Sequence, residues 1–406
     1  MKKAAKPKSP NVLTYNVVKA MLRLLSTFLV SVKFQKDPEI NKIKGPVLAL
    51  GTHSTPMDVA FSFLAVRKKR LNVVCGRDVL SWKWLNVFRK GLRMIPTSQF
   101  DLDLSSVKAI KRAVASGCSI ALFPEGKISI DGRNLHYIAP AITKLIKLLN
   151  VPVVFSHAYG GFSVKPRWGH GIRRGRIVYK SEVLFSQDQI KEMSSEDMHK
   201  VLVEKFKYND NEYRIENKLQ YKCINPAEGM HYILYKCPKC GTEYEMDSKG
   251  DEVFCKVCGY KVMYGKFGQF EAVDDNIPPV FDRIDTWYDY QKESVVKEIS
   301  EDTFEISKPV SWYSMDNVTF EYEKMGEGML YINKEVIGFT GKDLIENPVE
   351  FQLSLSGLFT VVQKVDEAID LTVNTVIHRF IFKEGKYSAK YNLIVEEMFK
   401  LNNKVE

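Results

Sequence analysis

The sequence lacks a long apolar run. Its first apolar stretch is interrupted by Lys19 and Arg23, and the longest uncharged run there extends only from Leu24 to Val32. A helix that crosses a bilayer needs about 20 apolar residues, and no small-residue cleavage site follows this run. We therefore expect neither a transmembrane helix nor a signal peptide.

Internal repeats and low-complexity tracts are also missing. The chain has 406 residues, of which 45% are hydrophobic and 12% are aromatic. These values are typical of globular domains with real cores and argue against disorder. The length allows several domains.

Cysteines are few and unevenly spaced, which argues against a disulfide framework. Of the seven, four form a close set and three are scattered. The close set consists of Cys237, Cys240, Cys255 and Cys258. This pattern indicates thiolate–metal chemistry in a reducing compartment, so we expect a cytoplasmic protein.

Acidic residues are scarce in the first half of the chain. Residues 1–222 carry 39 Lys and Arg against 17 Asp and Glu, a net charge of +22, whereas residues 223–406 carry 20 against 32, a net charge of −12. A strongly basic half suits an anionic membrane surface or a nucleic acid. Charge alone leaves both partners open.

Residues 12–34 are expected to form an amphipathic helix. Its apolar face would carry Val17, Met21, Leu24, Leu25 and Phe28, with Lys19 and Arg23 along another face. Such a helix either packs on its own domain or lies in the headgroup region of a membrane. Both roles stay open at this stage.

From Gly45 onward, short apolar runs alternate with helix-like segments. The runs are residues 47–52, 71–76, 91–96, 119–124 and 151–156, and the helix-like segments include residues 105–117, 139–149 and 193–206. This alternation predicts an α/β domain, expected over residues 1–222, with a largely parallel or mixed sheet. The ends of the strands are then the expected location of a site.

Residues 53–58, which read HSTPMD, follow the first of these runs. Pro56 suits the first position of a helix, and Asp58 in the first turn can fold back toward the His53 ring. A carboxylate on one imidazole nitrogen fixes the tautomer and leaves the other nitrogen free to accept a proton from a hydroxyl. By itself the spacing is also compatible with an ordinary strand-to-helix turn.

A second stretch, FPEG at residues 123–126, follows a later apolar run of the same α/β unit. Together the two stretches resemble the glycerolipid acyltransferase family, whose signature is a His-x4-Asp block followed by a Pro-Glu-Gly block. The resemblance extends over about residues 12–220 and includes the weaker blocks at residues 91–96 and 151–156.

This resemblance implies transfer of an acyl group from acyl-CoA or acyl-carrier protein to the free hydroxyl of a lysophospholipid. The implied acceptor is 1-acyl-glycerol-3-phosphate, which would give phosphatidate. His53 would be the general base and Asp58 its orienting partner. Glu125 and Gly126 would belong to the acceptor site. The resemblance does not supply the cations of that site, and for them we select Lys127 and Arg93 from the basic residues near these blocks.

The chain departs from the family pattern in two places. The family usually has Thr-Arg-Ser after Pro-Glu-Gly, where this chain has residues 127–129, and the arginine usual at the end of the second block aligns with Thr97. Lys90, Arg93 or Arg133 could also supply a cation. A lysine binds phosphate as a point charge, without the bidentate fork of an arginine.

Two Cys-x2-Cys-Gly turns, at residues 237–241 and 255–259, predict a zinc ribbon over residues 223–268. Each turn directs two sulfurs to one point, and the four thiolates complete a tetrahedral Zn²⁺ site with no open position, so the metal should be structural. Iron with the same ligands is the alternative. This segment has no excess of Lys and Arg, so we expect no nucleic-acid partner.

The remainder of the chain predicts a linker helix within residues 269–302 and a β-rich domain over residues 303–406 that closes with a helix. Many strands followed by one helix loosely resemble a pleckstrin-homology or GRAM-like domain. The acidity of this region argues against a clamp for anionic lipids by bulk charge.

Three functions follow from these patterns. The first is a peripheral acyltransferase on the inner face of the membrane, held there by the basic half and by the helix at residues 12–34. The second, motivated by Thr97 and residues 127–129, is a catalytically inactive acyltransferase-like scaffold whose ribbon and C-terminal domain bind a protein partner. The third, which the lack of excess Lys and Arg in the ribbon segment argues against, is a nucleic-acid binder built on the basic half and the ribbon.

Overall fold

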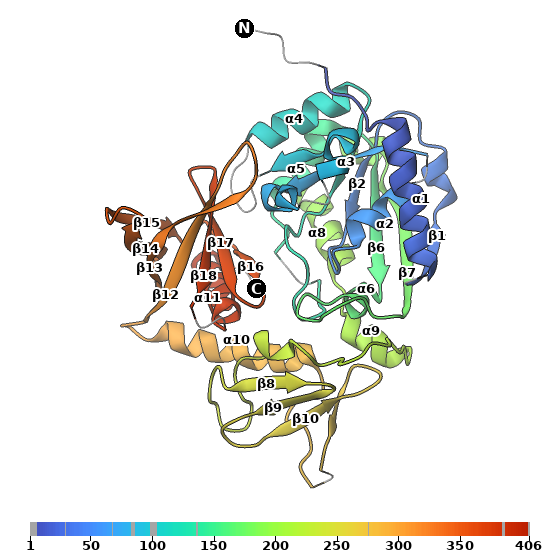
Figure 1. Cartoon of the computed structure of the whole chain (residues 1–406). Helices are drawn as coiled ribbons and strands as arrows, with labels where there is room; N and C mark the ends of the chain where they lie inside the picture. Colours follow the sequence, from blue (N-terminus) through green and yellow to red (C-terminus); the bar gives the residue numbers. More distant parts are fainter. Residues whose placement is uncertain are drawn as a thin grey trace. The chain divides into compact units, whose positions relative to one another are not determined.

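The computed structural model describes residues 6–28, 30–66, 68–82, 86–97, 104–134, 137–274, 276–383 and 386–404. The chain divides into two compact units (Figure 1). We call Met1–Thr97, Leu102–Pro166 and Gly171–Cys223 the N-terminal unit. The C-terminal unit contains Ile224–Glu406 together with Arg167–His170.

A seven-stranded mixed sheet, in the order β1-β7-β6-β2-β5-β3-β4, forms the centre of the N-terminal unit. Its strands are β1 (Ser31–Lys36), β2 (Leu48–Gly51), β3 (Leu71–Gly76), β4 (Ile95–Thr97), β5 (Ser119–Leu122), β6 (Val153–Tyr159) and β7 (Arg176–Phe185). Neighbouring strands are parallel except β6 and β7. The α/β prediction is confirmed.

Helices cover both faces of this sheet. They are α1 (Val12–Phe28), α2 (Asp58–Ala65), α3 (Asn86–Leu92), α4 (Leu104–Ala115), α5 (Ala141–Leu149), α6 (Gly161–Val164), α7 (Gln187–Glu192), α8 (Ser195–Phe206) and α9 (Asp210–Glu216), with 3-10 turns η1 (Pro38–Asn41) and η2 (Arg77–Ser81). One apolar core joins the sheet to α4, α5, α7 and α8, and a second joins it to α1, α2 and α3. In α5, for example, Ile142, Ile146 and Leu149 recur at helical spacing and are buried.

The helix expected over residues 12–34 is wrong in its last part. Helix α1 ends at Phe28, and β1 follows as an edge strand paired in parallel with β7. Within β1, exposed and half-buried residues alternate with the period of two that a strand requires. The apolar face that predicted the helix ends with Phe28, and the helix ends at the same residue.

Two other boundaries also differ from expectation. The run at residues 91–96 begins as the end of α3, and only Ile95–Thr97 is a strand. Helix α2 starts at Asp58, two residues after Pro56, and its N-cap residue Met57 makes no side-chain capping bond. Among the described residues, no helix combines the length and apolar content needed to cross a bilayer.

A four-stranded antiparallel sheet, in the order β11-β10-β9-β8, begins the C-terminal unit after the turn η4 (Met230–Tyr232). The strands are β8 (Met246–Lys249), β9 (Glu252–Cys255), β10 (Lys261–Tyr264) and β11 (Phe270–Ala272). β8 and β9 form a hairpin between the two cysteine turns, with Gly250 at positive φ. β11 lies beyond residue 268, so this sheet extends into the segment expected as a linker.

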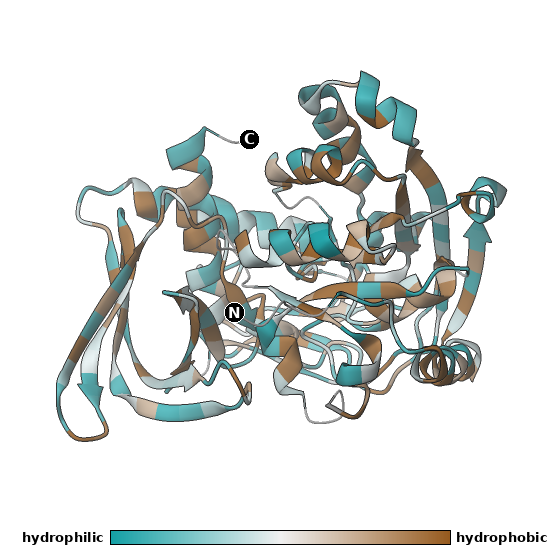
Figure 2. Ribbon diagram, turned by 90° about the horizontal axis from the view of Figure 1, so that it is seen from above, coloured by the Kyte–Doolittle hydropathy of each residue, from teal (hydrophilic) through white to brown (hydrophobic). Residues whose placement is uncertain are grey.

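Helix α10 (Ile284–Ser300) leads to a seven-stranded antiparallel sheet in the order β15-β14-β13-β12-β18-β17-β16. Its strands are β12 (Glu305–Met315), β13 (Tyr322–Asn333), β14 (Val336–Asp343), β15 (Pro348–Ser354), β16 (Val362–Lys364), β17 (Ala368–Val373) and β18 (Val376–Phe382), and α11 (Ser388–Asn403) closes the chain. Hydrophilic and hydrophobic residues alternate along the long strands (Figure 2). The inner face packs on α11, where the Tyr391 hydroxyl donates to the Leu330 carbonyl at 2.8 Å.

Candidate active site and metal centre

The two sequence blocks of the N-terminal unit meet because of the strand order. His53 follows β2 and Glu125 follows β5, and these strands are parallel neighbours in which Leu50 pairs with Leu122. The carboxyl ends of parallel strands meet at one edge of a sheet, which is where ligands bind in open α/β sheets. The two blocks are therefore in contact at the ends of the strands, where the sequence predicted a site.

His53 and Asp58 face each other across the turn before α2. His53 Nδ1 lies 3.6 Å from Asp58 Oδ2, and the same carboxylate oxygen accepts the Thr55 N–H at 2.8 Å. The first distance is longer than a hydrogen bond, but catalytic contacts are often long in structures without substrate. The His53 side chain is 16% exposed and Asp58 is 0% exposed, so the imidazole is the group that a substrate can reach.

The FPEG turn and the residues that follow it contact the backbone and the ring of His53. Glu125 Oε1 accepts the His53 backbone N–H at 2.6 Å, and the His53 carbonyl accepts the Ser129 N–H at 2.9 Å. The Phe123 ring lies 4.8 Å from the imidazole, centroid to centroid. Both backbone groups and one ring face of His53 are therefore held by a single loop.

Glu125 is fully buried, so it contacts the His53 turn and does not face solvent. Burial raises the pKa of Glu125 to about 8, although hydrogen bonds from Asn134 and from the His53 N–H counteract this effect. Burial also raises the pKa of Asp58, and the neighbouring His53 and Thr55 lower it in part. Two buried carboxylates thus serve one partly exposed imidazole, an arrangement common at functional sites.

Asn134 completes this cluster and was not predicted from the sequence. Its amide nitrogen donates to Glu125 Oε2 at 2.9 Å and to Oε1 at 3.1 Å, and its amide oxygen accepts the Ser54 hydroxyl at 2.9 Å. No motif marks an asparagine nine positions after the glutamate, so no local signal could have identified it.

The predicted cations have different surroundings. The Arg93 guanidinium donates to the Ser9 carbonyl at 2.8 Å, which fastens the segment before α1. Arg133 forms a 2.5 Å ion pair with Asp131. Lys127 lies near enough to Glu125 to lower the pKa of this carboxyl.

Gly126, next to Lys127, has φ of +69°, a conformation that glycine adopts without strain. The Gly126 N–H donates to the Phe123 carbonyl at 3.1 Å, which closes the turn. Gly126 therefore shapes the turn that carries both Glu125 and Lys127.

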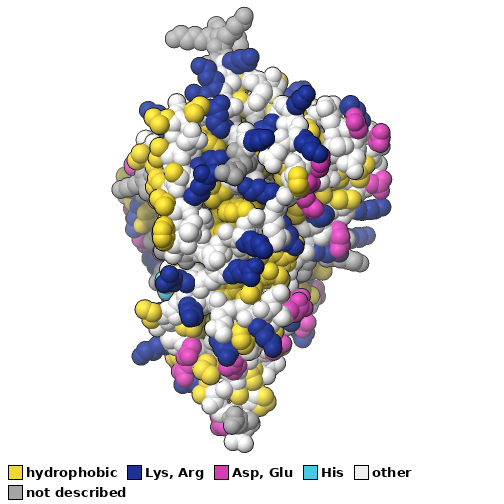
Figure 3. Space-filling view, turned by 90° about the vertical axis from the view of Figure 1, so that its right-hand side faces the viewer, with side chains coloured by type: hydrophobic (Ala, Val, Ile, Leu, Met, Phe, Trp, Pro, Cys, Tyr) yellow, Lys and Arg dark blue, Asp and Glu magenta, His cyan; other side chains and the backbone are white. Residues whose placement is uncertain are grey.

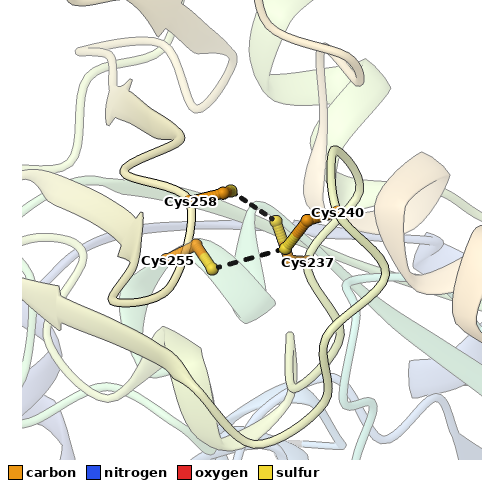
Figure 4. Close-up of side chains that lie close together, drawn as sticks. All are labelled: Cys237, Cys240, Cys255 and Cys258. Atoms are coloured by element: carbon orange, nitrogen blue, oxygen red, sulfur yellow. Dashed lines mark hydrogen bonds between the residues drawn. The ribbon is translucent and has the colours of Figure 1, made fainter.

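The four predicted metal ligands converge in the C-terminal unit (Figure 4). Their sulfur atoms all lie within 4.8 Å of one another, with 3.7 Å between Cys237 and Cys258 and 3.8 Å between Cys240 and Cys255. A tetrahedral Zn²⁺ with Zn–S bonds of about 2.3 Å places its sulfurs roughly 3.8 Å apart. The donor set therefore fits a structural zinc ion.

His53, Asp58 and the FPEG turn all lie within residues 31–155. Those residues match the family model described as Acyltransferase. The resemblance to acyltransferases is confirmed. The match ends within the N-terminal unit, and it supports acyl transfer as the chemistry of this unit.

The ribbon has a match of its own. Residues 229–266, which contain all four cysteines, match the zinc-ribbon model described as "DNA directed RNA polymerase, 7 kDa subunit". This match supports the predicted ribbon and the four-cysteine zinc site. No match is found among curated proteins.

One solved structure similar to this chain is the crystal structure of the 1-acyl-sn-glycerophosphate (LPA) acyltransferase PlsC from Thermotoga maritima. The two chains are 16% identical, with a TM-score of 0.41. The similarity covers 50% of this chain and 79% of that chain.

Proposed function

We propose that this protein transfers an acyl group from a thioester donor to the free hydroxyl of a lysophospholipid at a membrane surface. The observation that carries the proposal is the partly exposed His53 imidazole beside the buried Asp58, at the joined ends of β2 and β5, in the segment that matches the acyltransferase model. The proposed donor is acyl-CoA or acyl-carrier protein. The proposed acceptor is 1-acyl-glycerol-3-phosphate, which would give phosphatidate.

In the proposed reaction His53 is the general base. Asp58 orients the ring through Nδ1, so that Nε2 takes the proton of the acceptor hydroxyl as its oxygen attacks the thioester carbonyl. The tetrahedral intermediate then breaks its C–S bond and expels the thiolate, and His53 gives the proton to the leaving sulfur. No covalent acyl-enzyme is needed, because both substrates bind together and proximity supplies much of the rate.

We propose Lys127 as the main cation for the acceptor phosphate, with Gly126 shaping its loop. Lys127 follows Glu125 and Gly126 in the loop beneath the His53 turn and lies close enough to Glu125 to lower its pKa, so it is the predicted cation nearest to the His53 and Asp58 cluster along this loop. Because lysine acts as a point charge, this site would select less strictly for a phosphate monoester than a bidentate arginine would. Lysophospholipids with other anionic headgroups are therefore included in the test.

Helix α1 supports a peripheral position on the membrane. Its buried residues are Tyr15, Lys19 and Ser26, and Val18 and Leu22 pack against the core, whereas the predicted apolar face is exposed. On that face Val17, Met21, Leu24, Leu25 and Phe28 are between 40% and 69% exposed. The side on which α1 lies also carries many Lys and Arg side chains among apolar ones (Figure 3). We propose that this surface binds the inner, anionic face of the membrane.

Incubation of the purified protein with acyl-CoA or acyl-carrier protein and a panel of lysolipids, read by mass spectrometry, tests the activity. We expect phosphatidate from lysophosphatidate, and we expect His53→Ala to lower the rate by about 10³-fold or more with an unchanged thermal transition. A His53→Ala protein that keeps near-full activity would contradict the mechanism.

Liposome flotation tests the membrane surface. Leu24→Glu together with Phe28→Glu should weaken binding to anionic liposomes by at least about tenfold, because burying each large apolar side chain contributes about 1.5–3 kcal/mol. Leu148→Glu on α5, where the side chain is 45% exposed, is the matched control. Equal losses in both proteins would show that α1 has no special role.

The alternative is a catalytically inactive scaffold whose ribbon and C-terminal sheet bind a protein partner. The observation that favours it is the departure at Thr97 and residues 127–129. The likeness of the C-terminal sheet and α11 to a pleckstrin-homology or GRAM-like domain would then describe the working part. Turnover of any lysolipid by the purified protein would eliminate this alternative.

A further inference from the structure

The Asn134 side chain joins two separate parts of the turn that carries His53. Its amide nitrogen donates to both oxygens of Glu125, and its amide oxygen accepts the hydroxyl of Ser54, the residue after His53. Asn134 is 1% exposed. An amide is suited to this place because it offers donors on one side and an acceptor on the other.

The contact with Glu125 reaches His53 directly. Glu125 Oε1, which accepts from Asn134, also accepts the His53 N–H at 2.6 Å. A carboxylate that lost the amide donors could rotate away from the His53 backbone, since its other oxygen would then have no hydrogen bond from Asn134. The imidazole position depends on that backbone.

Asn134 is itself fixed by the segment around α9. Its N–H donates to the Tyr208 carbonyl at 2.9 Å, and the preceding Gly132 carbonyl accepts the Asp210 N–H at 2.8 Å. The Asn211 amide also donates to the Asp131 carbonyl at 2.7 Å. The loop that presents Asn134 is therefore held by residues far along the chain.

We propose that Asn134 is a positioning residue for acyl transfer, because its amide holds the Glu125 carboxylate against the His53 backbone and thereby places the imidazole beside Asp58. The proposal rests on the proposed role of His53 as the base. Asn134 is buried and contacts Ser54 and Glu125, so its loss should act on the catalytic step more than on substrate binding.

The ionisation of Glu125 gives this role a distinct readout. The titratable groups facing Glu125 are His53 and Asp58 from the turn before α2 and Lys127 from its own loop. Burial is the main cause of the raised pKa of Glu125, and the Asn134 amide is the largest effect that lowers it. Loss of the amide should raise this pKa further, so that Glu125 binds a proton at a higher pH and accepts the His53 N–H less well.

The kinetic test compares wild type, Asn134→Ala and the matched control Asn72→Ala. Asn72 lies on β3, is 3% exposed, and donates to the Arg93 carbonyl at 2.9 Å. We expect Asn134→Ala to lower kcat by about 10- to 100-fold, as misplacement of a reacting group does, with KM within about twofold. In the dependence of kcat on pH, the fall in kcat on the acidic side should move to higher pH for Asn134→Ala. For Asn72→Ala it should stay at the wild-type pH. Wild-type kcat and an unchanged pH dependence in Asn134→Ala would overturn the proposal.

A double-mutant cycle with Glu125→Gln tests the route of the effect. If Asn134 acts through Glu125, then Asn134→Ala should lower kcat much less in the Glu125→Gln protein than in wild type, because the two residues form one unit. Equal factors in both backgrounds would show that Asn134 acts elsewhere, and would refute the proposal.

A readout without turnover separates this inference from the proposed function. With ¹⁵N-histidine labelling of the full chain, the His53 backbone amide should shift with a midpoint near pH 8 as Glu125 titrates. The midpoint should rise in Asn134→Ala, or in Asn134→Ser if the alanine variant fails to fold, and the shift should vanish in Glu125→Gln. If wild type acylates no lysolipid, the proposed function fails and this titration still decides the contact. An unmoved midpoint with active wild type refutes only the inference.

Discussion

Two clusters of buried carboxylates, one in each unit, are arranged differently. In the N-terminal unit, Asp58 and Glu125 accept hydrogen bonds from neutral backbone and amide groups, and burial raises the pKa of both. In the C-terminal unit, Glu243 accepts from Lys390 at 2.7 Å and from Lys236 at 3.1 Å. Burial alone would raise the pKa of Glu243, but the two lysines lower it below its ordinary value.

The second cluster also contains Glu298, whose carboxylate lies 2.6 Å from Lys390 and 3.7 Å from Lys236. Two lysines therefore face two glutamates, and they come from the ribbon, α10 and α11. Paired charges of this kind keep one charge state over a wide pH range and suit a structural contact. Carboxylates held only by neutral donors change state more easily, which suits a site that moves protons.

Zinc removal should have the largest effect on folding stability, and this effect should be confined to the C-terminal unit. A structural zinc site contributes on the order of 10 kcal/mol to folding, as zinc-finger peptides show. We expect a chelator to abolish the calorimetric transition of the C-terminal unit while that of the N-terminal unit remains. Retention of both transitions after metal analysis shows no zinc would contradict a structural role for the four cysteines.

Removing one lysine from the cluster of Lys236, Lys390, Glu243 and Glu298 should cause the second-largest loss of stability. Lys390→Met leaves Glu243 and Glu298 with one lysine between them, and loss of one partner of a buried pair costs about 3–5 kcal/mol. The control is Lys400→Met on the same helix, where the ion pair with Glu397 involves a 40% exposed lysine and is worth about 0–1 kcal/mol. Urea unfolding measures both, and equal losses would remove the structural distinction between the two lysines.

Asp58→Asn should leave the fold intact and reduce the rate. The amide oxygen can still accept the Thr55 N–H, but it cannot stabilise a protonated His53 as a carboxylate does. We expect kcat for acyl transfer to fall by about 10²-fold, equivalent to about 2.7 kcal/mol, with little change in the thermal transition. A rate within about threefold of wild type would show that the pair does not act as a dyad.

Glu125→Gln should change how the stability of the protein depends on pH. The pKa of Glu125 is raised from 4.5 to about 8 in the folded protein. Its contribution to the free energy of unfolding is therefore full below pH 4.5 and is lost as the pH rises through about 8, at no more than about 1.4 kcal/mol per pH unit for one proton. Subtracting the Glu125→Gln profile from the wild-type profile should show this slope, and parallel profiles would contradict the buried position of the carboxyl.

Local patterns predicted much of this architecture. Apolar runs flanked by turn residues marked most of the strands of the N-terminal sheet, and the two cysteine turns marked the ribbon, because each pattern is complete within a few residues. Local patterns did not predict the secondary structure of segments that depends on contacts with distant parts of the chain. The helix expected over residues 12–34 includes most of residues 31–36, but these residues form β1, since pairing with β7 satisfies their backbone groups.

By itself, the sequence determined which side chains can do chemistry: the imidazole and carboxylate of HSTPMD, the FPEG turn, and four thiolates at ribbon spacing. Only the tertiary structure decided how they are used, because β2 and β5 become neighbours through contacts between distant segments. That pairing places Glu125 against the His53 backbone, and Asn134, from a loop held at α9, joins Glu125 to Ser54. The hydrogen bond from the His53 N–H to Glu125 spans 72 positions of the chain and depends on the order of the strands, and no short stretch of sequence specifies that order.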